Sequence, residues 1–154
     1  MATYVFDSGP FIDLHNYPES VFPTLRAAIV SRLTGGLIVS CEEVYGELTV
    51  KDDDVLELVK PHKALFARPS EAEQRIVIEI TMAHPELVAR SIRRADKFNA
   101  DPFVIARAEA EGAIVVTSER YKLNAHNVPG ICRRRGVEAI NLLGFLERER
   151  LRFG

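Results

Sequence analysis

Short apolar runs alternate along the chain with segments whose apolar residues recur at helical spacing. The runs are rich in β-branched residues and are bounded by glycine, proline or polar residues, which is typical of buried strands. We expect four strands, at residues 3–6, 37–39, 113–117 and 137–141. Near-continuous apolar strands separated by helices indicate a parallel sheet that is covered on both faces. The pattern therefore predicts an α/β fold, a three-layer α/β/α sandwich with a mainly parallel central sheet.

Capping residues, glycine and proline suggest where the helices begin and end. Ser8 indicates a helix start directly after the first strand, and Ser40 with Glu43 predicts an N-cap after the second. Ser70 with Glu73 has the same spacing. The expected helices cover residues 18–33, a stretch that opens at 52–54, 70–84, a short stretch to 94, 101–112, a short basic turn after a loop at 118–130, and a closing segment to about 152.

The chain has the size of one domain, with 154 residues and a mass of 17.2 kDa. We therefore expect a single domain over residues 1–154. No apolar run approaches the ~20 residues of a membrane span, and the first strand leads into Asp7 without a basic segment or a signal-type apolar core. The two cysteines, Cys41 and Cys132, provide no disulfide framework. These features predict a cytoplasmic protein without a membrane partner, in which both cysteines are buried as small apolar residues.

Charge is distributed unevenly between the two halves of the chain. The net charge of −2 argues against a protein that holds nucleic acid by bulk electrostatics alone. Residues 1–77 carry 7 Lys+Arg and 12 Asp+Glu, whereas residues 78–154 carry 13 and 10. This layout is either an ordinary solvated surface or an acidic centre with a basic flank. The second arrangement suits an anionic polymer whose phosphates meet a metal site.

Acidic residues lie where the expected strands end. Asp7 follows the first strand, and Glu119 follows the third. Glu43 and Glu47 lie on the first turns of the helix after the second strand. Asp101 opens the helix that precedes the third strand, so its position is near the same edge of the sheet. Because ligands bind at the carboxyl ends of parallel strands, these acids are the candidate site.

Carboxylates this close together repel one another unless cations intervene. Mg²⁺ and Mn²⁺ prefer oxygen ligands, and two such ions ~3.5–4 Å apart can activate a water and stabilise the leaving oxygen in phosphodiester cleavage. The pattern therefore favours metal-dependent hydrolysis. Each acid also has a structural interpretation: Asp7 and Asp101 as helix caps, Glu43 and Glu47 as a solvated helix face, and Glu119 as an exposed loop residue.

Other common sites lack their motifs. The sequence has no Gly-rich phosphate loop that ends in Gly-Lys-Ser/Thr, and Ser8 does not have glycine on both sides at the fixed spacing that a serine nucleophile needs. Asp7 is not followed two places on by the second aspartate of haloacid dehalogenase-type phosphatases. The histidines have no metal-ligand spacing with one another or with the cysteines, and we expect most of them at the surface or at helix ends. They are His15, His62, His84 and His126.

Four segments resemble, in order, the successive motifs of PIN-domain ribonucleases. They are VFDSGPFI at 5–12, VYGEL at 44–48, ADPFVIA at 100–106 and VVTSE at 115–119. Each motif is short, and their order and distances make the resemblance more specific than any one of them. It covers essentially the whole chain. The nearest branch is the VapC-like toxins of prokaryotic toxin–antitoxin pairs, or a group of PIN-like proteins beside them.

The resemblance implies a Mg²⁺- or Mn²⁺-dependent endoribonuclease that acts as the toxin of such a pair. The family's metal-binding acids match Asp7, Glu47 and Asp101, and a fourth catalytic acid matches Glu119. The family usually has Asp at that fourth position, which weakens the expectation of a tightly bound second metal. Thr117 matches the hydroxyl residue that supports the site. The resemblance also implies a homodimer and an antitoxin partner that blocks the groove.

Further residues could contribute to this site. Glu43 lies one turn before Glu47 and could share or replace its role, and Asp96 lies near Asp101 in the chain. Basic residues of the second half are available for RNA phosphates. They are Arg120, Lys122, Arg133 and Arg134, together with Arg93, Arg94 and Arg135.

Two other functions compete with this hypothesis. The first is a PIN-like protein without catalysis that acts as an RNA-binding or protein-docking module, and the glutamate at position 119 leaves it open. The second is a DNA nuclease of the related flap or 5′-exonuclease kind. Those nucleases carry extra helical elements, for which this chain is too short.

Overall fold

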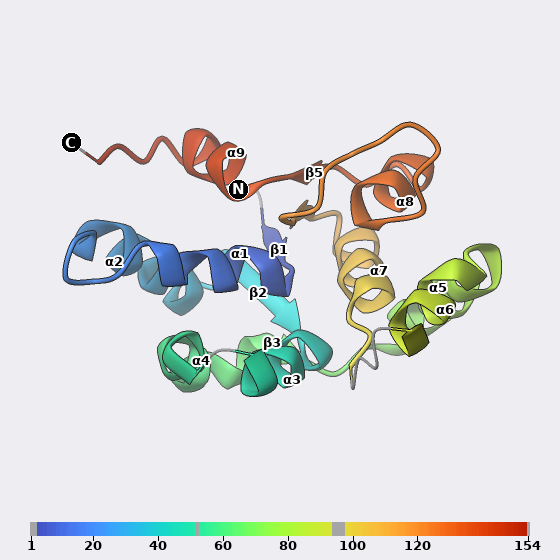
Figure 1. The fold of residues 1–154 in the computed structure, drawn as a ribbon, viewed down its shortest axis with the longest axis horizontal. Coiled ribbons are helices and arrows are strands. Elements are labelled where there is room, and N and C mark those ends of the chain that lie inside the picture. Colours follow the sequence, from blue (N-terminus) through green and yellow to red (C-terminus); the bar gives the residue numbers. More distant parts are fainter. Residues whose placement is uncertain (1–2, 52, 94–97, 154) are drawn as a thin grey trace.

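A computed structural model describes residues 3–51, 53–93 and 98–153, and its strands form one parallel sheet. The strand order is β3-β2-β1-β4-β5, and every pair of neighbours is parallel. The predicted α/β class is therefore confirmed, and the sheet is parallel throughout the described strands (Figure 1). The strands are β1 (Tyr4–Phe6), β2 (Ile38–Cys41), β3 (Phe66–Ala67), β4 (Ile114–Val116) and β5 (Ala139–Ile140).

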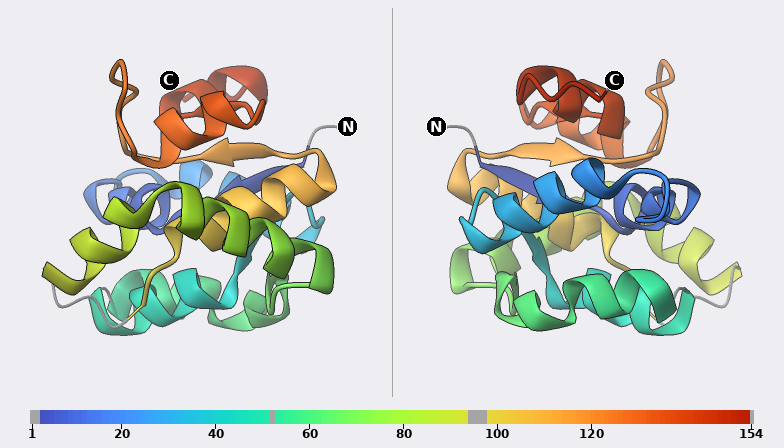
Figure 2. Two further views of the ribbon diagram at one scale, coloured as in Figure 1. Left: turned by 90° about the vertical axis from the view of Figure 1, so that its right-hand side faces the viewer. Right: turned by 90° about the vertical axis from the view of Figure 1, so that its left-hand side faces the viewer.

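Helices cover both faces of the sheet and complete the three-layer sandwich. Helix α7 packs directly on β1, β2 and β4, and α5 packs on the outside of α7. Helices α1 and α2 lie on the opposite side (Figure 2). The helices are α1 (Ser8–Asp13), α2 (Pro23–Thr34), α3 (Glu42–Lys51), α4 (Asp53–Val59), α5 (Glu71–Ala83), α6 (Pro85–Arg93), α7 (Asp101–Glu111), α8 (Val128–Arg134) and α9 (Leu142–Arg148), with short 3₁₀ turns η1 (Leu14–Asn16) and η2 (Lys60–Leu65).

Two helices follow their sequence signals closely. Ser70 caps α5 by accepting from the Glu73 N–H, and the Glu73 side chain accepts from the Ser70 N–H, which completes the expected capping box. Helix α7 ends at Gly112, whose φ of +65° is left-handed and strained for any residue with a side chain. The chain then turns directly into β4. The helix-glycine-strand unit predicted for this segment is therefore confirmed.

The predicted N-cap at Ser40 is wrong, because Ser40 belongs to β2. Its buried hydroxyl donates to the Phe6 carbonyl at 2.6 Å, so a neighbouring strand satisfies it in place of a helix terminus. The cap before α1 is also displaced by one residue. Asp7 accepts from the Ser8 N–H and is the N-cap, whereas Ser8 is the first helical residue.

Three other helix boundaries differ from those that the sequence predicts. Helix α2 begins at Pro23 and not at residue 18, since a proline inside the helix would lack an N–H and clash with the preceding turn. Helix α8 begins earlier than expected, because Asn127 caps it. Helix α9 ends at Arg148. Strand β3 was not predicted, because its two residues are too few to form an apolar run.

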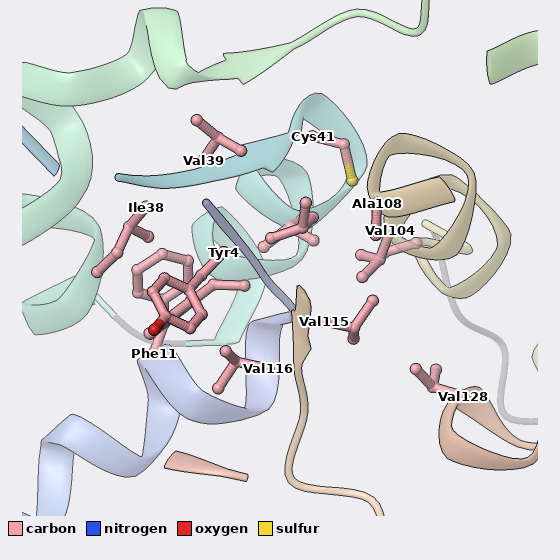
Figure 3. Packing of buried hydrophobic residues seen from close by; sticks show 14 of the residues in the cluster. Tyr4, Phe11, Ile38, Val39, Cys41, Val104, Ala108, Val115, Val116 and Val128 are labelled. Carbon is pink, nitrogen blue, oxygen red and sulfur yellow. The ribbon is translucent and has the colours of Figure 1, made fainter. Parts of the chain in front are cut away.

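Alternating side chains on the short strands fill a core on each face of the sheet. Val116 points toward Phe11 and Tyr4, whereas its neighbour Val115 points toward Val104 of α7 (Figure 3). On the first face the buried ring of Phe6 contacts Phe11 and Phe145 at centroid distances of 5.1 and 5.0 Å. Cys41 and Cys132 are buried free thiols, as expected. Among the described helices, none is long and apolar enough to cross a membrane.

Candidate functional site

The neighbouring strands β1 and β4 end side by side and place the first pair of candidate residues together. Phe6 at the end of β1 pairs with Val116 at the end of β4. The next residues are Asp7 and Thr117, and the Asp7 N–H donates to the Val116 carbonyl at 2.9 Å. Backbone pairing therefore places both residues next to each other at the carboxyl edge of the sheet.

Asp7 is almost fully buried, with 6% of its surface exposed. One carboxylate oxygen, Oδ1, accepts from the Ser8 N–H at 2.8 Å and caps α1. The other, Oδ2, accepts from the Thr117 hydroxyl at 3.0 Å. Asp7 is thus both a helix cap and a candidate ligand, and the Thr117 hydroxyl is hydrogen-bonded to it.

Asp101 enters the site from α7. The helix runs toward the start of β4, so its first residue lies at the opposite, carboxyl edge of the sheet. The N-cap of α7 is Ala100, which makes no side-chain cap bond, so the interpretation of Asp101 as a mere cap is wrong. Its carboxylate instead pairs with Arg90 of α6 at 2.8 Å.

Glu119 is held close to these two acids by its own local bonds. Its backbone N–H donates to the Thr117 hydroxyl at 3.2 Å, and its Oε2 accepts from the Val128 N–H at 3.1 Å. Carboxylate oxygens of Asp7, Asp101 and Glu119 all lie within 4.8 Å of one another. The residue with the weakest sequence signal is therefore a member of the tightest acidic group. We refer to these three residues as the acidic cluster.

Of the two candidate acids on α3, Glu43 and Glu47, it is Glu47 that faces the acidic cluster. The acidic cluster lines a hollow of about 290 Å³, and Glu47 lines it too. The Glu47 carboxylate accepts from the Ser8 hydroxyl at 3.2 Å and lies 3.6 Å from the Lys51 ammonium. Glu43 is not among the residues that line this hollow within the described chain. Its Oε2 is buried without a hydrogen-bond partner among the described residues. The geometry selects Glu47 over Glu43 as the α3 residue of the site, and Asp96 lies outside the described residues.

Among the described residues that line the hollow, the cations are Arg90 and Lys51, and neither was a sequence-based candidate. Lys51 follows Glu47 by one helical turn, a spacing that could have indicated the pair. Arg90 meets Asp101 only through the packing of α6, and no local pattern points to it. Of the basic residues expected to bind RNA, Arg94 lies outside the described residues. Four others, on the loop after Glu119 and on α8, are exposed outside the described lining of the hollow. They are Arg120, Lys122, Arg133 and Arg134.

Burial and mutual repulsion change the acidity of the cluster. Burial, followed by the Asp101 charge, raises the pKa of Asp7 to about 8. Burial and then the Glu119 charge raise the pKa of Asp101 to about 6, although Arg90 opposes the change. A cation among these oxygens would remove the repulsion, and hard divalent ions prefer such ligands. The arrangement can therefore hold Mg²⁺ or Mn²⁺ beside a hollow that admits a phosphate.

The fold and this hollow define an α/β protein with an acidic site at the carboxyl edge of a parallel sheet. The chain belongs to the family described as Domain of unknown function (DUF4411), whose model matches residues 4–153. A comparison with curated proteins finds no match.

We expect Glu119→Gln to weaken Mn²⁺ binding by about tenfold or more without lowering the melting temperature. Glutamine keeps an oxygen that can accept from the Val128 N–H, but it removes a charge from the acidic cluster. Isothermal titration of Mn²⁺ into both proteins measures the difference. Glu57→Gln, on the exposed surface of α4, is the matched control. Equal Mn²⁺ affinities of Glu119→Gln and the wild type would remove Glu119 from the metal site.

Proposed function

We propose that this protein is a metal-dependent endoribonuclease that hydrolyses RNA phosphodiester bonds. The observation that carries the proposal is the acidic cluster: three carboxylates from separate segments lie within 4.8 Å at the carboxyl edge of the sheet. Its members fall in motifs that resemble those of PIN-domain ribonucleases. A purely structural role would not require the fold to bury like charges together, because such a group destabilises the protein at neutral pH.

The residues fit a Mg²⁺ or Mn²⁺ ion. Asp7, Asp101 and Glu119 would hold it, with Glu47 on the adjacent wall of the hollow. When bound, the ion supplies a Lewis acid for the phosphate and lowers the pKa of a water molecule. The pKa values of Asp7 and Asp101 are raised because burial and neighbouring carboxylates make their negative charges unfavourable. A bound ion would neutralise these charges.

The chain's own residues prepare the site for a phosphate. Thr117 fixes one oxygen of Asp7 and the Ser8 N–H fixes the other, so the carboxylate keeps one orientation. Arg90 and Lys51 project positive charge into the same hollow. These cations would hold the non-bridging oxygens of the scissile phosphate next to the acidic cluster.

An exposed strip beyond Glu119 suits single-stranded RNA. Arg120, Tyr121 and Lys122 are exposed on the loop, and the Arg133 guanidinium lies 4.9 Å from the centre of the Tyr121 ring. Bases stack on such aromatic and guanidinium planes, while lysine and arginine contact phosphates. Arg134 contributes less to this strip, because its guanidinium donates to the Ala125 carbonyl at 2.8 Å.

The proposal includes the biological setting that the resemblance implies: a cytoplasmic toxin, a homodimer, and an antitoxin as protein partner. Exposed apolar side chains on α5 and α6 support a protein-binding face. They are Ile78, Met82, Val88 and Ile92, of which Met82 is 78% exposed. The mass of the purified protein, measured by light scattering, tests the homodimer, which a monomeric mass at micromolar concentration would exclude.

Cleavage of total RNA by the wild-type protein tests the proposed activity. We expect discrete new 5′ ends with Mg²⁺ or Mn²⁺ and none with EDTA, because the acidic cluster requires the ion to act on phosphate. DNA of the same sequence as a cleaved RNA serves as the second substrate and should remain intact. Cleavage of DNA alone would favour the flap-type nuclease. A folded protein that neither cuts RNA nor binds Mn²⁺ would favour the non-catalytic module.

A further inference from the structure

A second group of metal-ligating side chains lies outside the acidic cluster. His84 ends α5 as its C-cap and is buried, whereas His126 lies on the loop before α8 with its side chain 44% exposed. Their Nδ1 atoms are 2.8 Å apart. Glu86, in the first turn of α6, places Oε1 at 2.5 Å from the His126 Nδ1 and 3.9 Å from the His84 Nδ1. Spacing in the sequence did not indicate this site, because 42 residues separate the two histidines.

Hydrogen bonding alone does not satisfy this arrangement. A neutral histidine nitrogen carries either one proton or one lone pair, so the His126 Nδ1 can serve only one neighbour well. It meets the His84 Nδ1, the Glu86 carboxylate and, at 3.5 Å, the Arg134 guanidinium. If the His126 Nδ1 carries a proton and donates it to Glu86, it has no lone pair to accept from Arg134. Its contact with the His84 Nδ1 is then favourable only if that second nitrogen is unprotonated.

The three ligand atoms instead lie at distances that bracket the separation of ligands around a tetrahedral metal ion. Zinc binds histidine nitrogen and carboxylate oxygen at about 2.0–2.2 Å, which separates neighbouring ligand atoms by about 3.3 Å. The three distances in this group, 2.5, 2.8 and 3.9 Å, fall on both sides of that value. Two imidazoles and one carboxylate are also a known zinc ligand set, and they leave a fourth position for water.

We propose that His84, Glu86 and His126 form a binding site for a divalent transition-metal ion, for which we take Zn²⁺ as the test ion. The partial exposure of Glu86 and His126 lets the ion enter from solvent. The site joins the α5–α6 turn to the loop between β4 and α8. That loop carries Glu119, and its Asn127 caps α8 and donates to the Arg120 carbonyl. A bound ion would therefore fasten the loop against α5 and α6 and stabilise the fold.

The experiment compares metal-stripped full-length proteins before and after addition of Zn²⁺. To separate this site from the acidic cluster, Asp7→Asn serves as the parent, and the proposal does not depend on nuclease activity. At Zn²⁺ about 100-fold above its Kd, we expect the melting temperature of the parent to rise by about 5–10 °C. His126→Gln should lose this rise, and its exposed position makes misfolding less of a concern than at buried His84. His62→Gln, in η2, is the matched control and should keep it.

Co²⁺ in place of Zn²⁺ supplies a spectroscopic readout. The parent should show the intense visible bands of tetrahedral Co²⁺, and His126→Gln, folded by circular dichroism, should lack them. The proposal is overturned if His126→Gln and the parent show the same Zn²⁺-dependent rise and the same Co²⁺ bands. A parent that shows neither the rise nor the bands also overturns it.

Discussion

Replacing Asp7 with asparagine is expected to reduce RNA cleavage by about 10³-fold or more while raising the melting temperature at pH 8. The loss of activity corresponds to several kcal/mol of metal-assisted stabilisation of the transition state. The gain in stability follows because asparagine removes a charge that is buried beside Asp101 and Glu119. Loss of activity together with a higher melting temperature would distinguish a catalytic role of Asp7 from a structural one, because replacing a structural residue lowers the melting temperature.

The substitution should leave the local structure intact. The asparagine oxygen can still accept from the Ser8 N–H and cap α1, and its amide nitrogen can donate to the Thr117 hydroxyl. Asp53→Asn, at the exposed start of α4, provides the matched control for loss of one aspartate. Cleavage rates and melting curves are measured for the wild type, Asp7→Asn and Asp53→Asn. A folded Asp7→Asn protein with undiminished cleavage, or one that fails to fold, would argue against the assigned role.

The fold could be predicted from sequence where the signals are local. Apolar strand runs, the Ser70–Glu73 capping box and the turn at Gly112 each depend on residues a few positions apart, and each matches the structure. The prediction failed at Ser40, whose hydroxyl has the right spacing for a helix cap but bonds to the carbonyl of Phe6 on a neighbouring strand. A tertiary partner outweighed the local preference there.

The candidate site likewise has residues that local sequence signals identify and residues that only tertiary packing brings together. Asp7 could be identified because the carboxyl ends of neighbouring parallel strands meet at one edge. Glu119 also follows a strand, but only the structure shows that its carboxylate lies within 4.8 Å of those of Asp7 and Asp101. Arg90 and the His84–His126 contact arise where α6 and a loop pack against elements distant in sequence. No spacing rule reports such contacts, because the packing that creates them is global.

Stability without metal should fall as pH rises from about 5 to 8, and Mn²⁺ should reverse the fall. The fold raises the pKa of Asp7 from its ordinary value of 3.8 to about 8, so folding favours the protonated carboxyl. This contribution to the free energy of unfolding is complete below about pH 4 and is lost as the pH rises through 8. Asp101, with a pKa raised to about 6, acts in the same direction. One proton accounts for at most about 1.4 kcal/mol per pH unit.

The difference between the wild type and Asp7→Asn isolates this effect from all other titrating groups. In EDTA, the melting temperature of Asp7→Asn minus that of the wild type should grow by up to about 3–5 °C per pH unit between pH 5 and 8. With Mn²⁺ the difference should shrink or change sign, because the ion favours the ionised carboxylate and stabilises only the protein that retains the full acidic cluster. A constant difference across this pH range would show that Asp7 carries no strained charge, and the electrostatic reason for a metal at this edge of the sheet would no longer hold.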